Sequence, residues 1–211
     1  SNNAVAIVSH HVDHNPEQGD FTVNCWIFLD DWGAGHGQYI MHKGGGGIEG
    51  WHIRVKDDGT LQFQIEEVDP GDGDPAGDGV TVVISSAAGA ITLGKWHMIT
   101  CTIDYGNTIS IYINGELAQT PASISGITGT INKTANIYLL NYSENYDHVT
   151  SGTVTEWSIF KGVAFNQTQI NELYNDGKAL DATTHSQVAN LKGYWRNDGL
   201  NTTWKNIHNP G

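Results

Sequence analysis

The run Phe21-Thr-Val-Asn-Cys-Trp-Ile-Phe-Leu29 carries the clearest secondary-structure signal in the chain. Its odd-numbered residues, from Phe21 to Leu29, are all apolar, which is the period of a β-strand with one face in a core. Thr108 to Ile113 repeats the pattern with three isoleucines and then turns at Asn114-Gly115 into a following strand. Two such strands, far apart in the sequence, indicate a β-rich core.

Short β-rich runs broken by turn residues continue on both sides of these strands. Trp51 to Lys56 and Leu61 to Glu66 flank Asp57-Asp58-Gly59-Thr60, a hairpin signal in which the glycine supplies a positive φ. The other strands that we predict are Ala4–Val8, Gln38–His42, Val80–Ser85, Trp96–Asp104, Ile137–Asn141, Thr153–Phe160 and Leu191–Arg196. Many short strands separated by turns are typical of a sandwich or jelly roll.

One short helix is predicted near residues 166–176. Asn166 can cap it, Gln169 completes a capping-box pattern, and Gly177 follows where a helix commonly ends. Ile170, Leu173 and Tyr174 supply its apolar stripe. The chain contains no long linker, so we predict an all-β, antiparallel two-sheet sandwich that forms a single domain over residues 1–211.

The composition excludes two classes of partner. The 211 residues contain 23 Asp and Glu against 10 Lys and Arg, a formal net charge of −13. Nucleic acid and anionic lipid both require clustered basic residues, so neither is an expected partner. No apolar run approaches the roughly 20 residues that span a bilayer. Glycine supplies 26 of the 211 residues, about 12% against a usual share of about 7%. Most of these glycines are predicted to lie in turns.

Four segments of the sequence resemble successive strands of one family. They are Asp20–Trp26, Gly94–Thr100, Ile111–Gly115 and Glu156–Phe165. In order and spacing they are similar to laminin-G-like, concanavalin A-like jelly rolls, a superfamily that includes the pentraxins. The resemblance implies that fold over most of the chain. It leaves the function open, because this fold hosts lectins, adhesion modules, glycan hydrolases and structural proteins.

The last segment points to a larger protein. Leu191 to Gly199 resembles the strand that usually opens such a domain, yet here it comes last. We therefore expect the chain to be one piece of a larger, tandem or permuted surface protein.

The two cysteines leave two interpretations open. Cys25 and Cys101 each lie on the apolar face of a predicted strand, where buried free thiols are common. Pentraxins carry a cystine between strands that resemble these two, although Cys25 lies one position later than their pattern requires. A disulfide would imply an oxidising, extracellular setting.

The acidic residues do not form the pattern of a glycan hydrolase. Glucanases of this fold carry alternating acids on one strand, since two carboxyls must flank the scissile bond. Here Glu66 and Glu67 are consecutive and point to opposite faces, and Glu156 is the only acid in its strand. We therefore predict that the protein is not an enzyme and requires no cofactor.

The densest acidic stretch raises the question of calcium. Asp69, Asp72, Asp74 and Asp78 alternate with glycine and proline, and Ca²⁺ takes several oxygen ligands from a bent loop. The stretch lacks the spacing of an EF-hand, so we favour a solvated acidic loop over a calcium site. Calcium is common among laminin-G-like relatives, which keeps the site as an alternative.

Two loops combine aromatic and polar residues in the manner of a glycan site. Sugar rings stack on aromatic faces while small polar groups bond their hydroxyls. The candidate ligand-binding residues are Trp32, His36, Asn141, Tyr142 and Tyr146. Packing competes with ligand binding for Trp32 and is the favoured interpretation for both tyrosines.

The aromatic residues and histidines inside predicted strands are expected to have structural positions. Five tryptophans fall there, and packing is the default for them: Trp26, Trp51, Trp96, Trp157 and Trp195. His42, His52 and His97 are expected on strand surfaces.

The sequence thus favours a non-catalytic recognition module. Its expected ligand is a glycan or another cell-surface group, and its expected location is extracellular, at a cell surface or on a virion. The alternative is a structural decoration or filament subunit that associates with copies of itself or other subunits. A glycan hydrolase or lyase is the third hypothesis.

Overall fold

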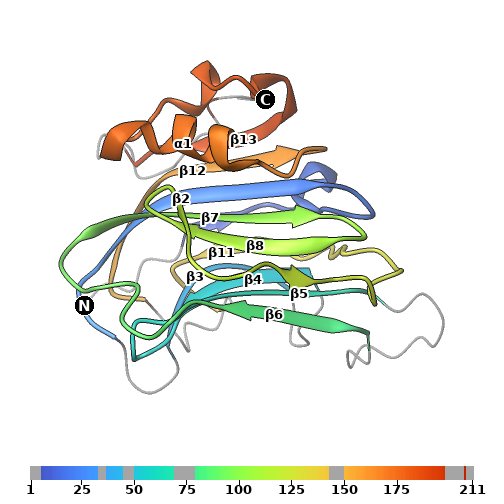
Figure 1. Cartoon of the computed structure of the whole chain (residues 1–211), viewed down its shortest axis with the longest axis horizontal. Coiled ribbons are helices and arrows are strands. Elements are labelled where there is room, and N and C mark those ends of the chain that lie inside the picture. Colours follow the sequence, from blue (N-terminus) through green and yellow to red (C-terminus); the bar gives the residue numbers. More distant parts are fainter. Residues whose placement is uncertain are drawn as a thin grey trace.

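The fold consists of two antiparallel β-sheets that face each other (Figure 1). The structure, a computed structural model, describes residues 6–32, 37–44, 50–68, 79–142, 150–197 and 207. Within these residues, a six-stranded sheet has the order β1 (Ala6–Val8), β11 (Ile137–Leu139), β3 (Gln38–Lys43), β4 (Gly50–Val55), β5 (Leu61–Glu66) and β6 (Thr81–Ser85).

The seven-stranded sheet lies above it in Figure 1. Its described strands have the order β10 (Ala122–Ser123), β8 (Thr108–Ile113), β7 (Trp96–Asp104), β2 (Phe21–Leu29), β12 (Gly152–Lys161) and β13 (Leu191–Trp195), and β9 (Glu116–Leu117) pairs with β8. The predicted antiparallel two-sheet sandwich is therefore confirmed.

The core lies between the two sheets. The odd-numbered residues of β2, from Phe21 to Leu29, are fully buried, as their alternation predicts. They join Ile53 and Phe63 of the opposite sheet in one continuous hydrophobic cluster. The even-numbered residues of β2 therefore point to the outer face of the seven-stranded sheet.

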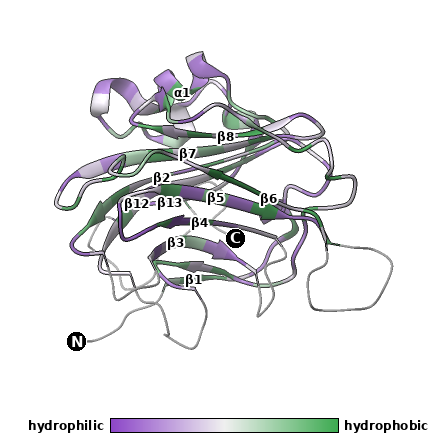
Figure 2. Ribbon diagram, turned by 60° about the horizontal axis from the view of Figure 1, so that its bottom comes forward, coloured by the Kyte–Doolittle hydropathy of each residue, from purple (hydrophilic) through white to green (hydrophobic). Residues whose placement is uncertain are grey.

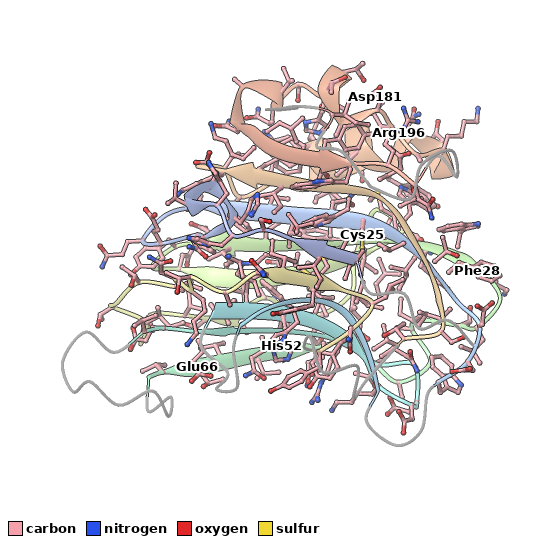
Figure 3. The ribbon with its side chains drawn as sticks, turned by 180° about the vertical axis from the view of Figure 1, so that it is seen from behind. Cys25, Phe28, His52, Glu66, Asp181 and Arg196 are labelled. Atoms are coloured by element: carbon pink, nitrogen blue, oxygen red, sulfur yellow. The ribbon has the colours of Figure 1, made fainter. Side chains whose placement is uncertain are left out.

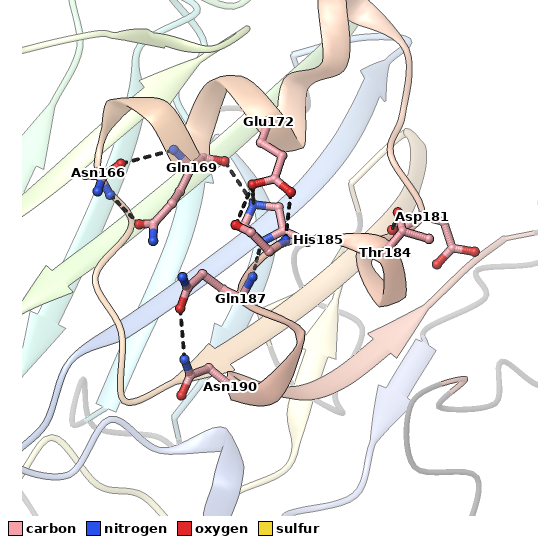
Figure 4. Close-up of polar contacts among 9 residues, drawn as sticks. Asn166, Gln169, Glu172, Asp181, Thr184, His185, Gln187 and Asn190 are labelled. Atoms are coloured by element: carbon pink, nitrogen blue, oxygen red, sulfur yellow. Dashed lines mark hydrogen bonds and ion pairs between the residues drawn. The ribbon is translucent and has the colours of Figure 1, made fainter.

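The predicted capping box of the helix is confirmed. In α1 (Gln167–Tyr174), the Asn166 side chain accepts a hydrogen bond from the Gln169 amide at 3.1 Å, and the Gln169 side chain accepts one from the Asn166 amide at 2.9 Å (Figure 4). The α-helix ends at Tyr174, because Asn175 and Asp176 both take left-handed φ angles. Short 3₁₀ turns are η1 (Val12–His14), η2 (Asn175–Gly177), η3 (Ala182–Thr184) and η4 (Val188–Asn190).

The segment around α1 covers part of the outer face of the seven-stranded sheet. Tyr174 stacks on Trp26 of β2, with ring centroids 5.9 Å apart. Ile170 and Leu173 pack beneath the helix in a second hydrophobic cluster that includes Met98 and Phe160 of the sheet. Figure 1 shows α1 on the side of β12 and β13, away from the six-stranded sheet.

The outer face of the six-stranded sheet has a different character. In Figure 2, β4 and β5 carry hydrophilic stretches, which correspond to His52 and Arg54 on β4 and to Gln62, Gln64 and Glu66 on β5. These residues alternate with the core residues of the same strands and so share the outer face.

The described edge strands are short. β1 has three residues and β10 has two, while β6 and β13 have five each. No helix among the described residues is long and apolar enough to cross a membrane.

Candidate ligand-binding site

The two loops that the sequence indicates leave the sandwich close together. The Asp30 amide donates to the Ser151 carbonyl at 3.0 Å, and the Ser151 amide donates to Oε1 of Gln38 at 3.1 Å. Thr150 Oγ1 donates to the Tyr39 carbonyl at 2.9 Å. These hydrogen bonds therefore hold the segments that flank residues 31–37 and residues 141–149 together at one end of the fold.

Tyr142 lies within a group of aromatic rings at this end. Its ring stacks on His42, with centroids 4.6 Å apart and planes at 7°, and meets Tyr39 at 4.9 Å. The His52 ring lies 5.7 Å from His42 and 5.6 Å from Tyr39. Together with Arg54, these four residues are here named the Tyr142 cluster.

The register of the strands explains why the Tyr142 cluster forms. His42 pairs with His52, and Tyr39 pairs with Arg54, across β3 and β4. A register shift between Tyr39 and Met41 lets both Tyr39 and His42 face outward, although three positions separate them. The cluster therefore occupies the outer face of the six-stranded sheet.

Arg54 is held by aromatic and amide groups. Its guanidinium carbon lies 5.9 Å above the Tyr39 ring, and Nε donates to Oε1 of Gln62 at 2.6 Å. One terminal nitrogen approaches the Tyr39 hydroxyl at 3.4 Å. Since Arg54 and Tyr142 are only half-buried, the cluster presents a guanidinium and an aromatic ring at its accessible side.

His52 is the least satisfied member of the cluster. Its side chain is buried, and its Nε2 has no hydrogen-bond partner within the described part of the chain. Burial, and to a lesser extent His42 and Arg54, lower the pKa of His52 to about 3. The imidazole is therefore neutral at pH 7, and a buried polar atom without a partner calls for a physical explanation.

His42 is neutral at pH 7 as well. Burial lowers its pKa, although the hydrogen bond between Nδ1 and the Tyr142 carbonyl raises it. A neutral imidazole has one donor and one acceptor nitrogen, so it suits hydroxyl groups better than anions. The two histidines therefore make this a polar, uncharged part of the cluster.

The structure places the other predicted ligand-binding residues differently. Asn141 is fully buried, and its Oδ1 accepts from the Tyr142 amide at 2.8 Å, so it shapes the backbone. Trp32 is half-buried and packs against the main core. His36 and Tyr146 lie outside the described residues.

The calcium alternative stays a prediction. Asp69, Asp72, Asp74 and Asp78 all lie outside the described residues. Among the residues that are described, no group of three or more His, Cys, Asp or Glu side chains could hold a metal ion.

The structure corrects the disulfide alternative. Cys25 and Cys101 are free, fully buried thiols. Cys25 lies opposite Ile99, and Cys101 lies opposite Val23, so the two cysteines are diagonal neighbours on adjacent strands. Diagonal Cα atoms are about 7–8 Å apart, whereas a disulfide accepts at most roughly 7 Å. In this register a cysteine at position 23, rather than at position 25, would lie directly opposite Cys101.

Glu156 is engaged by one side chain of the last strand and by the residue that directly follows that strand. The Tyr194 hydroxyl donates to its carboxylate, and Arg196 Nε donates to Oε1 at 2.9 Å. Arg196 also lies 3.6 Å from the Asp181 carboxylate, and Figure 3 shows Asp181 and Arg196 side by side. Glu156 lies where the register of β12 and β2 shifts, with φ at 50°. This arrangement fastens β13 to β12 at an irregular point of the sheet.

Of the five members of the Tyr142 cluster, the sequence indicated only Tyr142 as a candidate ligand-binding residue. His42 and His52 were expected on strand surfaces, and that expectation is wrong, because both are buried. The sequence pattern did not indicate Tyr39 or Arg54 either. The direct pairing of His42 with His52 and the nearby Tyr39 would have indicated the cluster only with a known strand register.

The sequence matches one protein family, and the fold matches several solved structures. A sequence profile of the concanavalin A-like lectin/glucanases superfamily, of laminin G type, matches residues 1–171. No curated protein matches the sequence at a significant level.

Several solved structures share the fold. The binding domain of Paraclostridial Mosquitocidal Protein 1 has a TM-score of 0.66 and 20% identity, covering 84% of this chain and 42% of that one. A candidate carbohydrate binding protein from Bacteroides ovatus has a TM-score of 0.64 and 17% identity, covering 100% and 54%. The botulinum neurotoxin serotype G binding domain has a TM-score of 0.56 and 19% identity, covering 84% and 39%. The chain thus spans about half or less of each structure.

Proposed function

The chain belongs to the concanavalin A-like lectin/glucanases superfamily, and on that premise we propose that it is a non-catalytic module that binds glycans. The Tyr142 cluster is the proposed site. The observation that carries the proposal is the grouping of Tyr142 and Arg54, both partly accessible, above the buried His52 whose Nε2 is unpaired among the described residues.

The chemistry of the cluster suits a sugar. The Tyr142 ring offers an aromatic face for the C–H side of a pyranose. The Arg54 guanidinium and the neighbouring Gln62 amide can bond hydroxyl groups, and the neutral imidazole of His52 can accept or donate one hydrogen bond. Mostly apolar or aromatic walls with a few placed polar groups are typical of small-molecule sites.

The charge of the protein favours an uncharged ligand. A net charge of −13 repels polyanions at long range. Since both histidines of the cluster are neutral at pH 7, Arg54 is its one cationic member. Neutral glycans are therefore the proposed ligand class.

The cluster lacks the groups that glycan cleavage uses. Hydrolysis of a glycosidic bond commonly needs two carboxyls that flank it. None of the five residues of the Tyr142 cluster is acidic, and the Glu156 carboxylate is engaged by Tyr194 and Arg196. Binding without catalysis is the role that these residues support.

The context of the proposed module is extracellular. The similar structures include binding domains of two toxins and a candidate carbohydrate binding protein, which supports recognition of a surface. Those structures are about twice as long as this chain or longer, which supports its being one piece of a larger extracellular or virion assembly.

A glycan array tests the proposal. Wild-type protein should bind a set of neutral glycans, and Tyr142→Ala should weaken that binding at least about tenfold, or 1.4 kcal/mol. Tyr142→Phe keeps the ring and should bind nearly as well as the wild type. Leu117→Ala, an exposed residue of β9, serves as the control.

Two outcomes would contradict the proposal. If the wild type and Tyr142→Ala are both folded and bind glycans equally well, the Tyr142 cluster is not the binding site. An array silent for the wild type, together with stable oligomers in solution, would favour the structural subunit instead.

A further inference from the structure

Trp96 departs from the packing expected of a strand tryptophan. It begins β7, and 46% of its surface is exposed. Its ring lies 5.6 Å from that of Phe28, its direct partner on β2, and the two planes meet at 55°. The two rings form an aromatic pair on the outer face of the seven-stranded sheet.

Within the described part of the chain, α1 covers a neighbouring aromatic residue on this face but no element covers this pair. Trp26 and Phe28 alternate to the same side of β2, yet Trp26 is only 8% exposed because Tyr174 stacks on it. Trp26 belongs to the cluster beneath α1, whereas Phe28 and Trp96 do not. Figure 3 shows Phe28 at the margin of the molecule, with Cys25 of the same strand further inside.

Polar groups flank the aromatic pair. Thr153 of β12 lies directly opposite Phe28, so a hydroxyl, a phenyl ring and an indole follow one another across three strands. Asp30, the first residue after β2, is exposed, and its amide donates to the Ser151 carbonyl at 3.0 Å, two residues before Thr153. Hydrogen-bonding groups beside an aromatic surface are what a sugar ring requires.

We propose that Phe28 and Trp96 form a second glycan-binding surface that stacks on the C–H face of one pyranose ring, with Thr153 and Asp30 bonding its hydroxyls. This inference takes its ligand class from the proposed function. It concerns a different sheet and different residues from those of the Tyr142 cluster.

Size and charge distinguish a sugar from other occupants. Trp96 exposes about half of an indole, or about 100 Å², whereas a stable protein partner covers about 800 Å² on each side. A charge of −13, with Asp30 at the site, opposes anionic lipid. A single sugar ring matches the small aromatic surface and its polar border.

Four variants on the same glycan array test the inference. Trp96→Ala should weaken binding of at least one glycan about tenfold or more, and Trp96→Phe should retain most of the affinity because it keeps a ring. Trp96→Leu should bind as poorly as Trp96→Ala, since it keeps apolar area but no aromatic face. Leu117→Ala, 44% exposed on β9 of the same sheet, should bind like the wild type.

The results separate this inference from the proposed function. If Tyr142→Ala loses binding while Trp96→Ala binds every glycan as the wild type does, the Phe28–Trp96 surface is overturned and the Tyr142 site stands. If Trp96→Ala loses binding while Tyr142→Ala binds as the wild type does, the Tyr142 site is overturned and the Phe28–Trp96 surface stands. Equal affinities for Trp96→Leu and wild type would replace sugar stacking by a general apolar contact and so overturn the inference. A wild type silent on the array overturns both.

Discussion

The indole rings of Trp157 and Trp195 stack on each other, with centroids 4.0 Å apart and planes at 17°. The two residues lie directly opposite each other on β12 and β13, and both are buried. The Trp195 ring also lies over Gly193 of its own strand, so that a Cβ on Gly193 would fall 2.1 Å from the indole. The absence of a side chain at Gly193 therefore allows the stack to form.

Gly193→Ala should destabilise the protein by about 1–3 kcal/mol, because the added methyl group forces the buried indole out of its position. Urea unfolding at 25 °C measures the change. Gly126→Ala is the matched control, since its Cβ would meet nothing closer than 3.8 Å. Equal stabilities of the two variants would show that the stack adapts without cost.

Much of the fold follows from the sequence, because alternation fixes which residues of a strand share a face. The predicted bounds of β2, β5 and β7 agree with the structure at both ends of each strand. The strand predicted after the turn at Asn114-Gly115 is β9, whereas β10 was not predicted, since its two residues carry no periodic signal. The contact between Gly193 and Trp195 depends on a side-chain rotamer that no sequence pattern reveals.

The thiols of Cys25 and Cys101 should be inert in the folded protein. Both are fully buried, and burial raises the pKa of each thiol, so little reactive thiolate forms. Ellman's reagent at pH 8 should therefore detect no thiol in the native protein and two per chain in denaturant. Fewer than two in denaturant without reductant would reinstate the disulfide.

Asn166→Ala should cost about 1 kcal/mol, because it removes the side-chain oxygen that caps α1. Asn166→Asp keeps a capping oxygen and should preserve stability. Thr168→Ala, at an exposed helical position, should cause no loss, since alanine favours a helix. Thermal unfolding of the three variants gives the comparison, and a loss for Thr168→Ala as large as that for Asn166→Ala would refute a capping effect.

Two buried histidines should make stability fall in mild acid. Burial is the main cause that lowers the pKa of His14 to about 4 and that of His52 to about 3, against about 6.5 in the unfolded chain. As the pH falls below 6.5, the unfolded state binds protons that the folded state does not. Stability therefore decreases down to about pH 4 for His14 and about pH 3 for His52, by roughly 1.4 kcal/mol per pH unit for each histidine.

Urea unfolding between pH 7 and pH 4.5 measures this slope. His52→Gln should reduce the slope by about one histidine's share, whereas Leu117→Ala, which removes no titratable group from an exposed position, should leave it unchanged. A His52→Gln protein with the wild-type slope would mean that His52 binds a proton in the folded state.

The candidate sites were less predictable than the fold, for one physical reason. A period of two tells which residues face outward but not which outer face another segment covers. Trp96 was expected to pack and is exposed, whereas His42 and His52 were expected at the surface and are buried. Tyr142 was singled out because its loop combined aromatic and polar residues, and the structure adds Tyr39, His42, His52 and Arg54 around it.

The short edge strands affect how copies of this protein meet. An unpaired strand edge is a template on which a strand from another chain can add, and long flat edges promote aggregation. The described edges have two to five residues, and the Ile207 amide donates to the Tyr194 carbonyl on β13. Copies crowded on one surface therefore have little exposed backbone through which to join their sheets, and any association between them depends on side chains.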